Sequence, residues 1–324
     1  MGILLFIANG FEESSTSSPQ MGQGCRIQRM SDNFTTTQSI EAFLHSLQAQ
    51  NFSGNTIRAY GDDLRQFAVW GASIRVDFDN PKRMSRMDVD GFMLVLSGKK
   101  LTGVTRVRKL AAIRKFFGFL ETNKVLSTNP ATTVIGARRE EKEPSILFKE
   151  QYKALLYEAS EDTRDYAIIM TFLQTGIRLS ELSNLKMEDI DFENRLLTVR
   201  QGKGKKDRQI PLVDEEVKAL RNYLHYRATE LILDDDILFL AKNGTSLNVS
   251  SVKAIVAKYV KKAGIRKRVS VHTLRHTFGA HKADKNMSLA TLQALMGHKK
   301  KETTLKYIHL ARTNLRKEMV ETAL

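Results

Sequence analysis

The chain has 324 residues, of which 42% are hydrophobic and 27% are charged. This length and balance predict about two globular domains, each with its own core. A formal net charge of +15 points to a polyanionic partner, DNA or RNA first and an anionic membrane surface second. The single cysteine, Cys25, excludes an intrachain disulfide and a zinc cluster built on cysteines.

Residues 1–29 show neither a helical nor a strand period. Their apolar run, Ile3 to Ala8, is too short to span a bilayer, and no Lys or Arg precedes it, so it makes a poor signal peptide. We expect this segment to be a disordered leader, a vector remnant or the product of an upstream mis-start, with Met30 as a plausible start.

Residues 30–134 are predicted to form a helical domain. Apolar residues at helical spacing predict helices over 36–50, 54–68, 87–96 and 101–124. Basic residues on the second and fourth helices are expected at the surface: Arg58, Arg106, Arg108, Lys109 and Arg114. Two basic helices favour a bundle that grips DNA, and the alternative is an ordinary solvated face.

Residues 135–144 are charged, lack a period and end in Pro144, which predicts a linker. A second domain is expected over 145–324, and the apolar spacing of Leu315, Met319 and Ala323 predicts a short amphipathic tail helix beyond Tyr307. Its predicted helices cover 148–159, 164–175, 179–185, 215–231 and 249–263, and its strands 196–200 and 209–212 form a hairpin around a Gly-Lys turn. The acidic trio Asp234–Asp236 is interpreted as a loop, although it could also be offered as a metal site.

The stretch from His272 to Tyr307 carries the clearest chemistry. If His272 opens a helix, Arg275 shares its face, and a guanidinium beside an imidazole can grip a phosphate. Tyr307 would supply a hydroxyl for attack. His272 and His276 also have the spacing of a zinc pair. The zinc interpretation is disfavoured because no Glu follows His272 and Arg275 would place a cation beside the metal.

This stretch resembles the tyrosine recombinase, or phage integrase, family, in which His-x-x-Arg, Gly-His and a nucleophilic Tyr occur in this order. Gln174–Leu182, containing Arg178, resembles the first-arginine box of that family, and Gln201–Arg208 resembles its lysine-bearing hairpin. The region around Ser53–Leu64 resembles its core-binding domain more weakly. The resemblance implies a mainly α, two-domain fold, with a helical core-binding domain and a catalytic domain that bears a small antiparallel sheet.

The resemblance also implies roles for individual residues. Arg178 and Arg275 would clamp the scissile phosphate, with Glu181 orienting Arg178, although alone Arg178 could simply pair with Glu181. Lys203 would protonate the leaving 5′ oxygen. His272 and His298 would bind the phosphate, and Tyr307 would attack it to give a 3′-phosphotyrosyl link. Thr56 would join the basic residues named above in binding DNA.

The expected activity is site-specific recombination through a Holliday junction, without metal, nucleotide or other cofactor. The expected partners are double-stranded DNA with inverted half-sites and further copies of the chain, in a tetramer on two DNA sites. We expect no membrane contact and a cytoplasmic, nucleoid-associated location. The length from Met30 resembles compact Xer-type and transposon-borne members. Two alternatives remain: DNA relaxation like that of a type IB topoisomerase, and a catalytically silent DNA-binding regulator.

Overall fold

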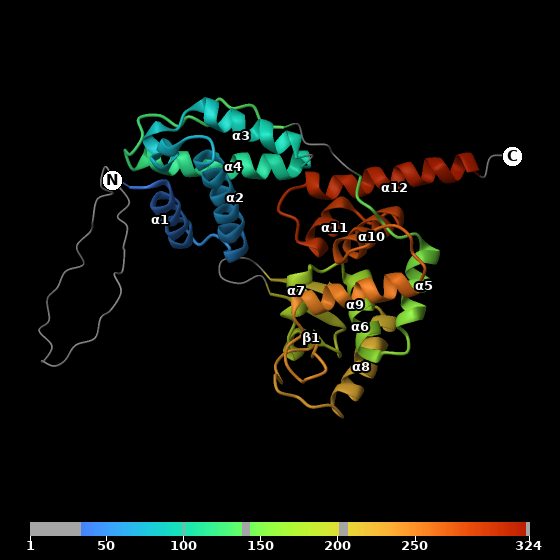
Figure 1. Ribbon diagram of the computed structural model, residues 1–324. Helices are drawn as coiled ribbons and strands as arrows, with labels where there is room; N and C mark the ends of the chain where they lie inside the picture. The colour runs from blue at the N-terminus through green and yellow to red at the C-terminus, as the bar shows by residue number, and fades with distance from the viewer. Residues whose placement is uncertain (1–33, 100, 138–142, 201–206, 322–324) are drawn as a thin grey trace, which may run out of the picture. The chain divides into compact units, whose positions relative to one another are not determined.

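The computed structural model describes residues 34–99, 101–137, 143–200 and 207–321, and side chains only as far as residue 311. The chain divides into two compact units, Met1–Lys142 and Glu143–Leu324 (Figure 1). This division falls inside the predicted linker. The predicted leader 1–29 lies outside the described residues.

The first unit is a helical bundle. Its helices are α1 (Thr36–Ala49), α2 (Gly54–Ala72), α3 (Arg86–Gly98) and α4 (Gly103–Thr122), with short 3₁₀ turns at Val76–Asp79 and Pro81–Arg83. Hydroxyl caps set three of the starts, because the side chains of Thr35, Ser53 and Thr102 each accept from a backbone amide three residues on. The core is aromatic: the Phe67 ring packs edge-on against Phe78, Phe92 and Phe117. The helices predicted from spacing are all present.

The predicted basic surface of this unit is partly wrong. Lys109 is only 4% exposed, and its Nζ donates to Asp63 Oδ1 and Gln66 Oε1, both at 2.7 Å. Asp63 is itself 1% exposed and also accepts from Arg108. A buried carboxylate needs a cationic partner, so tertiary packing turns Lys109 inward. Arg58 is exposed, as expected.

Two more of the predicted surface cations have partners within the unit. Arg106 donates to Ser97 Oγ at 2.9 Å. The Arg114 guanidinium donates to the carbonyls of Ala131 and Val134, which ties the segment after α4 back onto the bundle. Some of the N–H groups of Arg106 and Arg114 that the sequence pattern assigned to phosphates therefore donate to protein groups instead.

The second unit combines helices with one small sheet. Its helices are α5 (Lys149–Ala159), α6 (Thr163–Thr175), α7 (Leu179–Ser183), α8 (Asp214–Arg227), α9 (Val249–Lys262), α10 (Val271–Asp284), α11 (Leu289–Met296) and α12 (Glu302–Glu321). The strands β1 (Ile190–Asp191), β2 (Leu196–Val199) and β3 (Arg208–Pro211) form an antiparallel sheet in that order. Leu197 pairs with Ile190 on one side and Ile210 on the other. The hairpin of β2 and β3 was predicted, whereas two-residue β1 is too short to show alternation.

Helix α6 forms the centre of this unit's core. Ile168, Ile169 and Phe172 are fully buried because α5, α8 and α10 all pack against α6. Helix α10 in turn packs against α11 and α12. The tail helix expected beyond Tyr307 is the continuation of α12, which already begins at Glu302. Within the described parts of the chain, no helix has the length and apolar character needed to cross a membrane.

Candidate active site

The C-terminal end of α11 collects three arginines from three different elements. Gly297 follows α11 with φ +60°, a left-handed conformation that ends the helix and leaves its last carbonyls without helical partners. Each of three successive carbonyls instead accepts from one guanidinium: Leu295 from Arg208 at 2.7 Å, Met296 from Arg275 at 2.6 Å and Gly297 from Arg178 at 2.7 Å. The negative end of a helix dipole favours cations at this position.

Arg178 is held at the start of α7 by Glu181. The Glu181 carboxylate accepts from the Arg178 backbone amide and from its Nη1, both at 2.7 Å. It also accepts from both terminal nitrogens of Arg208, at 3.0 and 2.7 Å. Burial opposes ionisation of Glu181, but the hydrogen bonds from Arg208 and Arg178 outweigh it and lower its pKa to about 2. Glu181 is therefore a fixed anion between two guanidinium groups.

Arg275 is deeply seated on α10, with 5% of the residue exposed. Its Nη1 donates to the carbonyl of Gly176, the residue that ends α6 in a left-handed conformation with φ +62°. A Cβ at Gly176 would lie 2.3 Å from the Phe278 ring, so only glycine fits there. Burial, with the nearby Arg178 charge, lowers the pKa of Arg275 to about 10. Arg275 nevertheless stays a cation at neutral pH.

Tyr307 lies on α12 with its ring against α10. The residue is 1% exposed, and its hydroxyl is 2.7 Å from His276 Nδ1. The ring fits because α10 has Gly279 there, where a Cβ would lie 3.0 Å from the ring atoms. Burial raises the pKa of Tyr307 to about 12, against the opposing effect of Arg275. Burial and Lys306 lower the pKa of His276 to about 4, so its imidazole is neutral.

His298 is a second imidazole beside the Tyr307 ring. The two rings are nearly parallel, at 16° and 6.1 Å between centroids, and His298 Nδ1 is 2.8 Å from Thr304 Oγ1. Burial and the Arg275 charge lower the pKa of His298 to about 3. His272 is more exposed, and its pKa is lowered by partial burial and by Arg275. The two imidazoles beside Tyr307, those of His276 and His298, are therefore both neutral.

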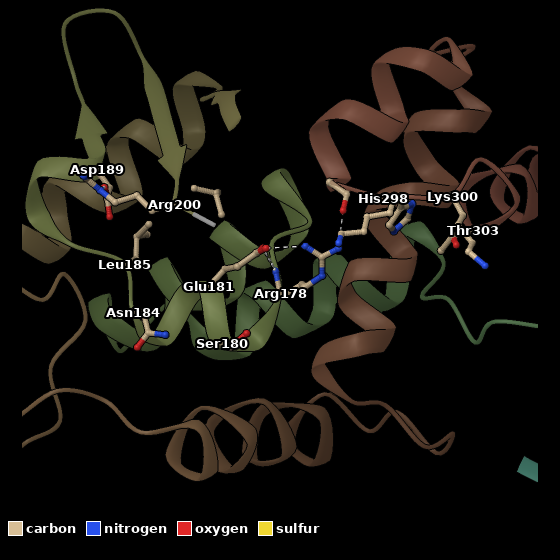
Figure 2. A pocket seen from close by; sticks show the side chains of 13 residues that line it. Arg178, Ser180, Glu181, Asn184, Leu185, Asp189, Arg200, His298, Lys300 and Thr303 are labelled. Atoms are coloured by element: carbon tan, nitrogen blue, oxygen red, sulfur yellow. Dashed lines mark hydrogen bonds and ion pairs between the residues drawn. The ribbon is translucent and has the colours of Figure 1, made fainter. Parts of the chain in front are cut away.

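A hollow of about 640 Å³ opens beside Arg178 (Figure 2). Arg178, Glu181 and His298 lie on its wall, together with polar and charged residues that include Asn184, Asp189, Arg200, Lys300 and Thr303. In Figure 2, Arg178 lies between Glu181 on one side and His298 on the other. The volume and the exposed cations suit a phosphate group on a polymer.

The structure brings together Arg178, Glu181, Arg275, His298 and Tyr307. The predicted Lys203 lies outside the described residues. Strand β2 ends before it, at Val199, and strand β3 begins after it, at Arg208. Sequence reasoning missed the contact of His276 with Tyr307 and the contacts of Arg208. Both join residues far apart in the chain, so no local pattern reports them. Among the described residues, no group of three or more His, Cys, Asp and Glu side chains is arranged to hold a metal ion.

The chain matches two family models. Residues 145–314 match the phage integrase family, and residues 40–124 match the N-terminal SAM-like domain of phage integrases. The chain therefore belongs to the phage integrase family, and it is a site-specific tyrosine recombinase.

Similar proteins narrow the class to recombinases of the Xer type. The chain is 35% identical over 283 residues to tyrosine recombinase XerC of Thermodesulfovibrio yellowstonii, covering 84% of this chain and 91% of the relative. It is 30% identical over 266 residues to a tyrosine recombinase of Pseudothermotoga lettingae, covering 82% and 90%. The XerH recombinase bound to palindromic difH substrate has the same fold, with a TM-score of 0.71, 22% identity and coverage of 87% and 83%. These similarities favour neither the topoisomerase nor the silent regulator.

Proposed function

We propose that Tyr307 is the nucleophile of DNA strand cleavage and that Arg178, Arg275 and His298 hold the scissile phosphate. The observation that carries this proposal is the placement of the arginines at the end of α11, beside the His298 and Tyr307 rings. Negative charge on the phosphate oxygens must be stabilised in the transition state. Cations fixed in advance do this without reorganisation.

In the proposed step, the Tyr307 hydroxyl oxygen attacks phosphorus and the bond from phosphorus to the 5′ oxygen breaks. The products are a 3′-phosphotyrosyl link and a free 5′ hydroxyl. Lys203 supplies the proton to the leaving oxygen, and His272 takes up the proton of the Tyr307 hydroxyl and helps to bind the phosphate. The 5′ hydroxyl of the partner strand then attacks the link, which releases Tyr307 and passes through a Holliday junction. The bond energy stays in the covalent link, so the reaction needs no cofactor.

The Tyr307 hydroxyl cannot reach a DNA phosphate while the residue is 1% exposed. A pKa of about 12 also disfavours its phenolate at neutral pH. Cleavage therefore requires the hydroxyl to leave His276 and α12 to shift on α10. In the cleavage complex, phosphate-bound arginines would replace burial as the main influence on the hydroxyl and ease its deprotonation.

The proposed partner is double-stranded DNA with inverted half-sites, bound by a tetramer across two sites in the nucleoid. The palindromic substrate in the XerH complex supports inverted half-sites, and the net charge of +15 supports a DNA partner. Residues 30–134 and residues 145–324 would each contact the duplex, with the linker 135–144 joining the two domains. Within the first domain, the proposed DNA contacts are Thr56, Arg58, Arg106, Arg108 and Arg114. Lys109 is not among them because it is buried and paired with Asp63.

The direct test is Tyr307→Phe on a nicked suicide duplex that carries half-sites selected by the wild-type protein from random-sequence DNA. The substitution removes only the hydroxyl, so DNA binding should be retained and the covalent adduct, resolved by denaturing gel, should be lost. A variant that loses adduct and binding together would indicate misfolding, which its thermal unfolding would reveal. If the folded Phe variant still forms the adduct, another residue attacks.

A further inference from the structure

We infer that Arg208 is a positioning residue for strand cleavage, which holds Glu181 and the end of α11 so that Arg178 faces the phosphate. This inference rests on the proposed role of Arg178. Arg208 opens β3, five positions after Lys203, and its side chain is 8% exposed. It is thus too enclosed to be an ordinary surface cation.

All three guanidinium nitrogens of Arg208 have partners. Nη1 and Nη2 donate to the two Glu181 oxygens at 3.0 and 2.7 Å, and Nε donates to the Leu295 carbonyl at 2.7 Å. This fork-to-fork geometry is the most directional form of an ion pair. One side chain therefore joins β3, α7 and the end of α11, and each of these segments adjoins a proposed catalytic residue.

The Glu181 carboxylate explains why the second arginine matters. Each of its oxygens is shared between Arg178 and Arg208, so neither cation is fully neutralised by it. The group of Arg178, Glu181 and Arg208 carries one net positive charge. Without Arg208 the group would be neutral, and Glu181 would be free to form a two-pronged pair with Arg178. Both changes reduce the attraction of Arg178 for a phosphate.

The contact with Leu295 adds a geometric role. The adjoining carbonyls of Met296 and Gly297 orient Arg275 and Arg178. His298 comes next in the chain. Arg208 therefore fixes the backbone on which both clamp arginines rest, and a displacement of about 1 Å at a reacting centre can cost about 100-fold in rate.

The chain contains a matched control for a merely structural arginine. Arg164 is also enclosed, with 13% of its side chain exposed. Its Nε and Nη2 donate to Asp165 Oδ1 at 3.0 and 2.8 Å, and its Nη1 donates to the Leu240 carbonyl at 3.2 Å. Neither partner is a proposed site residue. Loss of Arg164 should therefore cost stability without a specific effect on cleavage.

The experiment compares wild type, Arg208→Met, Arg208→Lys and Arg164→Met in the full chain on the selected suicide duplex. Single-turnover adduct formation and duplex affinity are measured separately, below each variant's melting temperature. We expect Arg208→Met to slow adduct formation about 100-fold while affinity changes by only a few-fold. Arg208→Lys should recover part of the rate, because a point charge restores attraction but not the fork. Arg164→Met should cleave at the wild-type rate.

The pH profile supplies a readout that lost stability alone would not move. Glu181 faces Arg178, Arg208 and, on α10, Arg275. In the wild type its pKa is about 2, below the working range. Without Arg208, its hydrogen bonds and its charge no longer lower the pKa of Glu181, and that pKa rises. The pH profile of cleavage by Arg208→Met should then show the Glu181 transition at a higher pH than the profile of the wild type. Adding Glu181→Gln to Arg208→Met should abolish that difference.

Two results would overturn the inference: a wild-type cleavage rate in Arg208→Met, or a rate loss equal to that of Arg164→Met with an unshifted pH profile. If Arg208→Met does not fold, Arg208→Lys decides, and a wild-type rate in that variant counts against the fork. Arg178→Ala is run alongside. Wild-type cleavage by Arg178→Ala would refute the proposed phosphate clamp itself. If Arg178→Ala loses cleavage while Arg208→Met cleaves at the wild-type rate, only the role of Arg208 is refuted.

Discussion

At the scale of single residues, the enclosed polar groups divide into those with partners and those without. Arg275, Tyr307 and Arg208 are nearly inaccessible, yet each has a partner of matching chemistry. Glu216 is different. It is fully buried in the first turn of α8, and neither carboxyl oxygen has a hydrogen-bond partner among the residues that the structure describes. Burial raises its pKa well above the usual value, opposed only in part by Lys282.

Glu216→Met should stabilise the second unit at neutral pH. A group whose pKa is higher in the folded state favours folding below its unfolded value, 4.5, and this contribution is lost as pH rises. Met also removes an unpaired buried polar group, which costs about 1–3 kcal/mol at either pH. The gain should therefore already be present near pH 4 and be larger near pH 8.

Denaturant unfolding at both pH values would measure the Glu216 effect. Glu215→Met is the matched control, since Glu215 lies in the same turn but is exposed. A Glu216→Met variant that is less stable than wild type at pH 8 would show that the carboxylate has a partner after all.

At the scale of elements, α10 is the helix on which the proposed site is built. It carries His272, Arg275 and His276, and it packs against both α6 and α12. Its small residue, Gly279, allows the Tyr307 ring to lie close to the helix. The position of the nucleophile thus depends on the fit between two helices.

Gly279→Ala should disturb that fit. The added methyl group would lie 3.0 Å from three atoms of the Tyr307 ring, so the ring or α12 must shift. Overpacking of this kind costs about 1–3 kcal/mol, which thermal unfolding can detect. Gly98→Ala in α3 is the control, because nothing lies within 4 Å of its added methyl group. Equal melting temperatures for both variants would mean that α12 yields freely at Tyr307.

The helices of the first unit allow a test of which cations meet DNA. Arg58 is exposed on α2, whereas Lys109 on α4 is paired with Asp63. Arg58→Met should weaken binding to random-sequence duplex and reduce the slope of log affinity against log salt by about one unit. Lys109→Met should leave that slope unchanged. A reduced slope for Lys109→Met would mean that the buried pair opens on DNA.

At the scale of the whole molecule, the proposed assembly joins the two units and several copies of the chain. Helix α12 carries Tyr307 and continues to Glu321. A tail that docked on a neighbouring copy would couple the nucleophile of one protomer to the presence of the next. The net charge of +15 would hold every copy on DNA.

Deletion of residues 315–324 tests this coupling. Tyr307 and Ala311 belong to the packed cluster under α12 and would remain. We expect binding to a single half-site to be unchanged, while the second half-site fills with less cooperativity and strand exchange is altered. Gel-shift titrations with one and two half-sites would measure this. Undiminished cooperativity together with normal recombination would exclude the tail as an assembly element.

The sequence by itself determined the family and the helices and pointed to the proposed catalytic residues, because periodicity, caps and motif order are local properties of the chain. Arg178, Arg275, His298 and Tyr307 could be named in this way. The tertiary structure alone decided how they are held. Three guanidinium groups meet at the end of α11, His276 binds Tyr307, and Asp63 draws Lys109 inward. These contacts join segments far apart in the sequence, and burial decides their protonation, so no local pattern encodes them.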